Sequence, residues 1–311
     1  MAPRPTPERR LSLHLLHPRQ WHRWLGIGVM RAFSMLPLPV LWACGVLLGE
    51  ALYRLHRPRR DIALVNIRKC FPELGAREQQ RLAKKHFRAL GQTALDIGIA
   101  WWASPARLRR LVRVSGVEHA RAVLEQGKNI ILLAPHFLGL EIAGARINME
   151  HPGCAVFRRV ANDVMDAVME KARTRFGAVL VDHNQPLMRV VRLVRSGMPL
   201  YYLPDQDAGQ RSSTFVPFFG IATATNAVLG PLAKLTDALV VPCLCRQLPR
   251  GQGYEVILRP PLTDFPSDDA VADAARMNRE IEGGVREMPE QYFWVHKRFK
   301  TRPPGEPDFY A

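Results

Sequence analysis

The sequence is poor in the residues that hold small disulfide-bonded domains or zinc sites together. Its 311 residues include only five cysteines, and no two of them form a C-x-x-C pair. An odd number without regular spacing argues against a disulfide framework and against a cysteine-based zinc site. We therefore expect free thiols in a reducing compartment and no metal. The cysteines are Cys44, Cys70, Cys154, Cys243 and Cys245.

The sequence also lacks the motifs by which many enzymes hold nucleotides or carry a covalent intermediate. It contains no P-loop, no G-x-G-x-x-G fingerprint and no G-x-S-x-G elbow. A nucleotide cofactor is therefore not expected, and an acyl-enzyme intermediate has no support from a local motif.

Acidic residues are few relative to basic ones. The chain has 28 Asp and Glu against 44 Lys and Arg, which gives a formal charge of +16. This balance favours an anionic partner, such as an anionic membrane surface, a phosphorylated substrate or an acidic carrier protein. Nucleic acid is a weaker alternative, because the sequence has no RNP, KH, zinc-finger or bZIP pattern.

One uncharged and strongly apolar stretch lies near the N-terminus. Residues 1–23 contain five arginines against one acid, and residues 32–49 are 18 uncharged positions. That length is marginal for a membrane span, and Pro37 and Pro39 would break a straight helix. Basic flanks and three nearby tryptophans favour an N-terminal hydrophobic membrane-anchor helix at a cytoplasmic membrane face, within a basic region of residues 1–55. The alternative is a helical hairpin buried in the core.

Residues 56–311 alternate between helical and strand-like patterns. Residues 59–74 and 76–102 predict helices, and Ser104 followed by Pro105 predicts the start of another. Strands alternating with helices predict an α/β domain with a mixed, mostly parallel sheet flanked by helices. In such domains ligands bind beyond the carboxyl ends of the strands. The strand-like runs are residues 129–134, 154–157, 178–181, 199–203, 238–245 and 254–258.

A histidine and a glutamate follow the most apolar of these runs. His136 comes directly after residues 129–134, and Glu141 comes five positions later. On one helix the two side chains would point about 140° apart. They can meet if His136 leaves a strand and Glu141 lies in the first turn of the next helix. The carboxylate can then accept one imidazole N–H and leave the other ring nitrogen as a base. The alternative is a half-buried loop histidine beside a glutamate that stabilises a helix N-terminus.

A second polar cluster follows residues 199–203. It contains Asp205, Asp207 and Arg211. The pattern D-x-D-x-G is equally that of a turn with an Asx cap, and a metal site is the weaker alternative because no further carboxylates are arranged as in a calcium loop. We expect a loop that positions polar groups at the carboxyl edge of the sheet.

Arginines mark a third cluster. Arg158 follows the run 154–157, Asn162 or Asp163 is expected to cap the next helix, and Arg173 lies near the end of that helix. The planar guanidinium of Arg158 can bind phosphate or carboxylate. Arg173 has the alternative role of an ordinary cation at a helix C-terminus.

Five segments together resemble one known family. APHFLGLE resembles block I (H-x4-D/E) of the lysophospholipid acyltransferase superfamily, and Glu141 is typical of its lipid A branch, the late acyltransferases. Leu138 to Leu140 depart from the HFGNWE-like sequence of many members, which concerns the wall of the pocket. The other segments, spread over about residues 59–310, are RRDIALVNIRKCFPEL, VFRRVANDVMDAV, PDQDAGQRSSTFVPFFG and PEQYFWVHKRFKTRPPGEPDFY.

The resemblance implies an acyltransferase domain at residues 56–311, with His136 as general base and Glu141 as its orienting partner. It implies transfer of a fatty acyl chain from acyl carrier protein to a 3-hydroxyacyl hydroxyl of Kdo2-lipid IVA or its acylated product. The implied location is the cytoplasmic face of the inner membrane of a Gram-negative bacterium, without cofactor or metal. The residues with implied supporting or substrate-binding roles are Arg173, Asp205, Asp207, Arg158 and Arg211.

Two alternatives stay open at this point. A glycerolipid or ornithine-lipid acyltransferase of the same superfamily would share block I. A membrane-anchored basic binding protein without catalysis would share the charge and the apolar segment.

Overall fold

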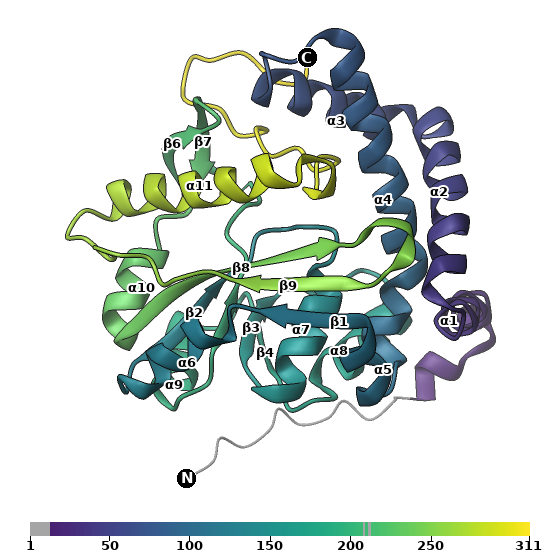
Figure 1. The fold of residues 1–311 in the computed structure, drawn as a ribbon, viewed down its shortest axis with the longest axis horizontal. Helices are drawn as coiled ribbons and strands as arrows, with labels where there is room; N and C mark the ends of the chain where they lie inside the picture. The colour runs from purple at the N-terminus through teal and green to yellow at the C-terminus, as the bar shows by residue number, and fades with distance from the viewer. Residues whose placement is uncertain (1–12, 208, 211–212) are drawn as a thin grey trace.

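The computed structural model describes residues 13–207, 209–210 and 213–311. Its centre is a seven-stranded sheet of order β1-β9-β8-β2-β5-β3-β4 (Figure 1). Neighbouring strands in this sheet are parallel, except for the β8–β9 pair, which is antiparallel. The predicted mixed, mostly parallel sheet is confirmed. The strands are β1 (Val112–Ser115), β2 (Asn129–Leu133), β3 (Cys154–Phe157), β4 (Val179–Asp182), β5 (Leu200–Tyr202), β8 (Ala238–Gln247) and β9 (Tyr254–Leu258).

A separate antiparallel hairpin, β6 (Thr214–Phe218) and β7 (Ile221–Thr225), packs against α11. The helices of the domain are α3 (Arg57–Cys70), α4 (Ala76–Trp102), α5 (Pro105–Leu111), α6 (Val117–Glu125), α7 (Leu140–Glu150), α8 (Asp163–Thr174), α9 (Leu187–Arg195), α10 (Leu229–Thr236) and α11 (Ala270–Glu287). Short 3-10 turns are η1 (Leu13–Leu16), η2 (Pro18–Gln20), η4 (Pro249–Gly251) and η5 (Pro289–Gln291).

Strand β2 lies in the middle of the sheet and is covered on both faces. Ile131 and Leu133 pack in one core cluster with residues of α3, α9, α10 and α11, whereas Ile130 and Leu132 pack in a second cluster with residues of α5, α6, α7 and α8. A strand buried on both faces reads as a continuous apolar run, which is what residues 129–134 show.

Helix boundaries follow the local signals in the sequence. Helix α5 begins after Ser104, whose hydroxyl accepts the Arg107 N–H at 3.3 Å. Helix α8 begins after Asn162, whose side-chain oxygen accepts the Met165 N–H at 3.1 Å. Both caps agree with the predictions, because a side-chain oxygen at these positions satisfies a backbone donor that the helix leaves unpaired.

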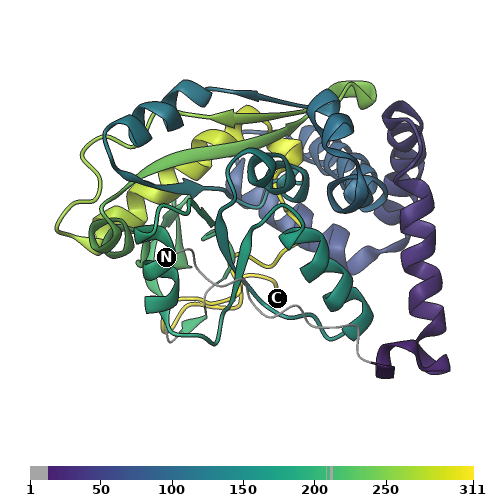
Figure 2. The same ribbon diagram turned by 90° about the horizontal axis from the view of Figure 1, so that it is seen from below.

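The N-terminal apolar segment forms two helices, α1 (Trp21–Phe33) and α2 (Leu38–Leu55), which lie at one side of the molecule (Figure 2). The prediction of a single anchor helix at the N-terminus is therefore wrong, because the segment is divided into two helices. The apolar run is interrupted before Pro37, and within the described residues only α2 is long and apolar enough to cross a membrane.

Helix α2 packs along α4 over its whole length. Gly45 and Gly49 of α2 face Gly91 of α4 so closely that a Cβ at Gly49 or Gly91 would overlap the backbone of the opposite helix. Close approach of two helices requires small residues at the crossing. As a result, 22% of α2 is buried against the domain.

Candidate active site

The candidate site lies at the carboxyl edge of the parallel strands. His136 follows β2, Asp205 follows β5, Arg158 follows β3 and His183 follows β4. These four strands are neighbours in the sheet and point the same way, so the loops that leave them meet at one edge. The predicted placement of His136 on a loop after a strand, with Glu141 in the first turn of the next helix, is confirmed.

Asp205 holds the imidazole of His136. Its Oδ1 lies 2.7 Å from Nδ1 of the ring, and its Oδ2 accepts the backbone N–H of His136 at 2.8 Å. The prediction that Glu141 accepts the imidazole N–H is wrong in this structure. The neighbouring parallel strand β5 brings Asp205 closer to the ring than the following helix brings Glu141, and the carboxylate of Glu141 is engaged elsewhere.

Burial and hydrogen bonding decide the state of this pair. Asp205 is 2% exposed, and burial alone would raise its pKa. The His136 charge, two hydrogen bonds from His136 and the Arg298 charge outweigh burial, so the pKa of Asp205 is lowered. An ionised carboxylate can only accept a hydrogen bond, so Nδ1 carries the ring proton and Nε2 is the free nitrogen. The neutral ring is thus oriented as a base.

Glu141 and Arg173 form an ion pair next to the ring. Arg173 Nε donates to Glu141 Oε2 at 3.2 Å, and Arg173 Nη2 donates to Glu141 Oε1. Burial would lower the pKa of Arg173, but the Glu141 charge and hydrogen bonds raise it above the usual value. Arg173 is therefore more than a cation at the end of α8, because it binds a carboxylate of a different helix.

The C-terminal segment completes the loop that carries His136. The Phe293 N–H donates to the carbonyl of His136 at 3.1 Å, and the Leu138 N–H donates to the carbonyl of Gln291 at 2.9 Å. The Asp207 N–H donates to Nε2 of His296 at 3.2 Å. Sequence reasoning did not identify the roles of Gln291 and His296, and their only signal was a polar, aromatic-rich tail.

Asp207 serves its own loop and the tail. Its Oδ1 accepts the Gly209 N–H at 3.1 Å, and its Oδ2 accepts the hydroxyl of Thr301 at 3.0 Å. The first bond is the Asx turn that the D-x-D-x-G pattern allowed. Arg211 lies outside the described residues. Within those residues no three His, Cys, Asp or Glu side chains are grouped as a metal site requires.

A cavity of about 470 Å³ opens at His136, and we call it the β3 cavity. Strands β3, β4 and β5 and helices α4, α7 and α8 form its walls, and it follows β3 from Gly153 to Arg158. Five strand steps correspond to roughly 16 Å. The polar groups at the opening are His136, Glu141, Arg158, Arg173, His183 and Gln206, whereas the walls are mainly Ala100, Trp101, Leu140, Gly144, Ala145, Cys154, Ala155, Phe157, Ala172, Ala178, Leu180 and Tyr201.

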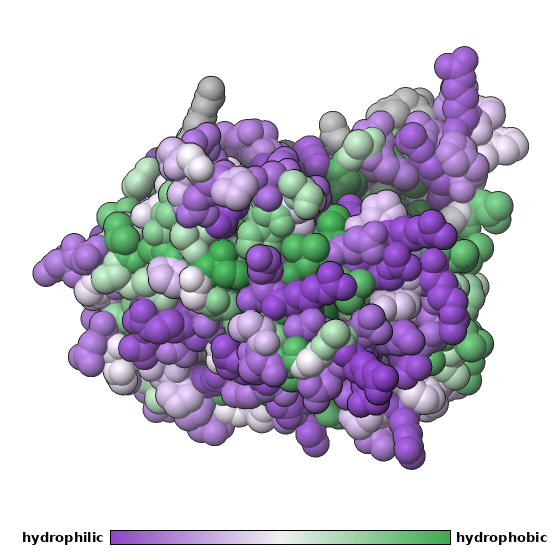
Figure 3. Space-filling view, turned by 90° about the horizontal axis from the view of Figure 1, so that it is seen from above, coloured by the Kyte–Doolittle hydropathy of each residue, from purple (hydrophilic) through white to green (hydrophobic). Residues whose placement is uncertain are grey.

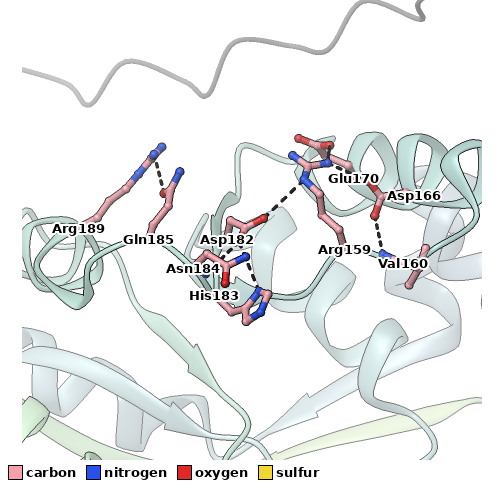
Figure 4. A network of polar contacts seen from close by, with 9 residues as sticks. All are labelled: Arg159, Val160, Asp166, Glu170, Asp182, His183, Asn184, Gln185 and Arg189. Atoms are coloured by element: carbon pink, nitrogen blue, oxygen red, sulfur yellow. Dashed lines mark hydrogen bonds and ion pairs between the residues drawn. The ribbon is translucent and has the colours of Figure 1, made fainter.

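Of the two neighbouring arginines after β3, Arg159 is paired with acids among the described residues and Arg158 is not. Arg159 reaches three acids, Asp166 at 2.8 Å, Glu170 at 3.3 Å and Asp182 at 3.5 Å (Figure 4). The adjacent Arg158 is exposed, lines the β3 cavity and has no ion-pair partner among the described residues. The local acids are thus bound to Arg159, and Arg158 leaves a positive charge at the opening.

Comparison with known proteins places this chain in a family. Residues 9–301 match the family model described as bacterial lipid A biosynthesis acyltransferase. The chain is 38% identical to the lipid A biosynthesis lauroyltransferase of Escherichia coli (strain K12), over 97% of this chain and 98% of that protein. It is 32% identical to the palmitoleoyltransferase of the same strain, over 98% and 99% of the two chains. It is 33% identical to the myristoyltransferase, over 93% and 90%.

Proposed function

We propose a specific reaction for this chain. The chain belongs to the bacterial lipid A biosynthesis acyltransferase family and is therefore an acyltransferase with a lipid acceptor. It transfers a fatty acyl chain from the thioester of acyl carrier protein to a 3-hydroxyacyl hydroxyl of Kdo2-lipid IVA or its acylated product. Family membership removes the alternative of a binding protein without catalysis.

The observation that carries this proposal is the position of His136 at the opening of the β3 cavity. The cavity is mainly apolar and follows β3 over roughly 16 Å, so it suits an extended hydrocarbon chain. His136 and the charged side chains of its lining lie at the end beyond the carboxyl ends of the strands. A chain seated in the cavity would place its thioester carbonyl next to the imidazole.

In the proposed mechanism His136 acts twice. Nε2 takes the proton of the acceptor hydroxyl while that oxygen bonds to the carbonyl carbon of the thioester. Asp205 stabilises the imidazolium that forms, as it accepts the Nδ1–H. The carbon–sulfur bond then breaks, and the imidazolium gives its proton to the departing thiolate. The products are an ester and a free thiol, and no cofactor takes part.

Two arginines supply positive charge along this path. Arg173 is fixed in the cavity wall by Glu141, where its charge can stabilise the oxyanion of the tetrahedral intermediate. Arg158 lies at the opening, where its guanidinium can bind a phosphate of the donor or acceptor. Glu141 thereby contributes through Arg173, and Asp205 through His136.

We also propose that α1 and α2 seat the enzyme on the cytoplasmic face of the inner membrane. Leu25 of α1 and Leu47 and Leu55 of α2 are 70%, 71% and 81% exposed. Figure 3 shows apolar side chains among hydrophilic ones at the side of the molecule where α2 lies. Exposed leucines beside basic residues match a helix pair at a membrane interface.

Replacing Leu25, Leu47 and Leu55 together by Ser tests the seating. The variant should move from the membrane to the soluble fraction in flotation with anionic vesicles. The matched control replaces Leu124 and Leu235, which are 45% and 46% exposed on other helices, by Ser. Membrane association that survives the first set, or is lost equally in the control, would contradict the seating.

The reaction is tested by offering acyl carrier protein and CoA thioesters, each with lipid IVA and lysophospholipid acceptors. We expect product only with the carrier-protein thioester and the lipid A precursor. His136→Ala should lower kcat by about 10²–10⁴-fold and leave the protein folded. Equal activity on lysophospholipid would favour the glycerolipid alternative. Full activity of the His136→Ala variant would contradict the mechanism.

A further inference from the structure

The β3 cavity extends from the opening at His136 to the amino ends of β3 and β4. Gly153 and Ala178 come directly before these two strands, and both residues line the cavity. The opposite end, after the strands, is the opening that Arg158 lines. The far end of the cavity therefore lies where β3 and β4 begin.

Helix α7 brings one amide side chain to this far end. Its residues Glu141, Gly144 and Asn148 line the cavity at steps of three and four positions, which place them on one face of the helix. At 1.5 Å per residue, Asn148 lies about 10 Å further along the helix axis than Glu141, which is at the opening. Among the described lining residues, Asn148 is the one carboxamide away from the opening.

Two hydrogen bonds hold the amide of Asn148 in place. Its Oδ1 accepts the backbone N–H of Gly153 at 2.9 Å, and its Nδ2 donates to the carbonyl of Gly144 at 2.8 Å. The residue is half-buried. Because the first bond joins the end of α7 to the start of β3, the amide cannot turn aside unless both bonds break.

A hydrocarbon chain that reaches this amide gains no affinity by extending further. Each methylene group that leaves water for an apolar wall strengthens binding about fourfold. Further methylene groups at Asn148 would have to displace the amide and leave the Gly153 N–H without its acceptor. A buried polar group without a partner opposes binding. The length of chain that fits is therefore limited by one side chain.

We propose that Asn148 determines the longest acyl chain that the enzyme accepts, with the thioester end of the chain at His136 and its methyl end against the Asn148 amide. That the occupant is an acyl chain rests on the proposed function. The limit itself is a property of the cavity and applies to any unbranched hydrocarbon with a polar end group. Shortening the Asn148 side chain should therefore admit a longer chain.

The test uses a readout that needs neither the donor nor the acceptor. Binding of free saturated fatty acids of increasing length is measured by native mass spectrometry, for the unchanged protein and for Asn148→Ala. Affinity should rise with chain length up to a limit and then stop rising. In Asn148→Ala this limit should move to a longer acid. The acid two carbons beyond the original limit should bind about tenfold more tightly to the variant than to the unchanged protein.

Asn129→Ala is the matched control. Asn129 is also half-buried at the amino edge of the sheet, and its Nδ2 donates to the carbonyl of Thr236 at 2.7 Å. It does not line the β3 cavity. This variant loses a comparable bond and should keep the original length limit. An unmoved limit in Asn148→Ala, or an equal shift in Asn129→Ala, overturns the proposal.

Asn148→Ser covers the case in which Asn148→Ala does not fold. Its hydroxyl keeps an oxygen acceptor on a shorter side chain, so the length limit should move in the same direction. A folded Asn148→Ser protein with the original limit contradicts the proposal as directly as the Ala variant would.

A second measurement separates this inference from the proposed function. Acyl transfer from a mixture of carrier-protein thioesters should give products whose longest chain moves with the binding limit. A moved binding limit together with no acyl transfer by the unchanged protein would refute the proposed function and leave the length limit at Asn148 standing. Acyl transfer with the same longest product in Asn148→Ala and the unchanged protein would refute the role of Asn148 alone.

Discussion

The imidazole of His136 is hydrogen-bonded to the carboxylate of Asp205, 69 positions away in the sequence, and not to that of Glu141, five positions away. Two bonds make this contact specific, because one oxygen binds the ring and the other binds the backbone of the same residue. Glu141 instead binds Arg173. The site thus contains two separate pairs, one that orients a base and one that places a cation in the cavity wall.

Asp205→Asn should reduce kcat by about a hundredfold or more and change KM little. The amide would favour the wrong tautomer of His136, so that Nε2 carries the proton. Steady-state kinetics with the lipid A precursor measures this. Asp207→Asn is the matched control, because Asp207 binds the loop and the tail instead of the ring. A loss of kcat as large in the control as in Asp205→Asn would contradict the assigned pairing.

Glu141→Gln should lower the free energy of unfolding by about 1–3 kcal/mol, because a half-buried guanidinium loses its charged acceptor. Arg173→Met should cost a similar amount. The double variant should lose less unfolding free energy than the two single variants lose together, because neither charge is then left without its partner. Denaturant unfolding of the four proteins measures the coupling. Strictly additive losses would show that the pair contributes nothing to stability.

Gly144→Leu should shift the preferred acyl chain to a shorter one. A Cβ at Gly144 meets only Tyr201, at 3.7 Å, so the backbone tolerates a side chain there and the rest of it enters the β3 cavity. Mass spectrometry of products from a mixture of chain lengths measures the shift. Gly283→Leu on α11 is the matched control, because its Cβ has only Arg259 near it, at 3.9 Å. An unchanged product profile would mean that the acyl chain does not occupy the β3 cavity.

Stability should fall in mildly acidic solution through His86. Burial lowers the pKa of His86 from 6.5 to about 4, although its hydrogen bond to the Glu290 carbonyl acts in the opposite direction. The unfolded chain therefore binds this proton first, and the free energy of unfolding falls as pH drops from about 6.5 toward 4. At pH 5 the loss amounts to about 2 kcal/mol.

His86→Gln removes this titration and keeps a donor for the Glu290 carbonyl. Thermal unfolding at pH 7 and pH 5 should show a smaller difference for this variant than for the unchanged protein. Equal differences in the two proteins would contradict the assignment to His86.

The helical and strand segments were largely readable from the sequence. Each of the six apolar runs became a strand, and Ser104 and Asn162 capped helices as predicted. The β6–β7 hairpin was missed. Its turn contains Phe219 with φ of +51° and Gly220, and its strands are stabilised by packing against α11, which a local pattern does not reveal.

The placement of α2 was also decided by packing. Hydropathy marks residues 38–55 as apolar, but only the glycines at the crossing with α4 show that part of this surface is buried within the protein. The same residues therefore leave a partly exposed helix on the side of the domain, joined to α1 by the turn before Pro37.

The sequence by itself determined the local features of the site. It determined that a buried strand ends in His136, that Glu141 begins a helix, and that Asp205 follows another strand. The tertiary structure alone decided which of these groups meet. Hydrogen bonding of β2 to β5 as parallel neighbours brings His136 and Asp205 to one edge of the sheet, and packing of both α7 and α8 against α4 brings Glu141 to Arg173. Strand order depends on contacts between residues far apart in the chain, so no spacing within one segment could specify it.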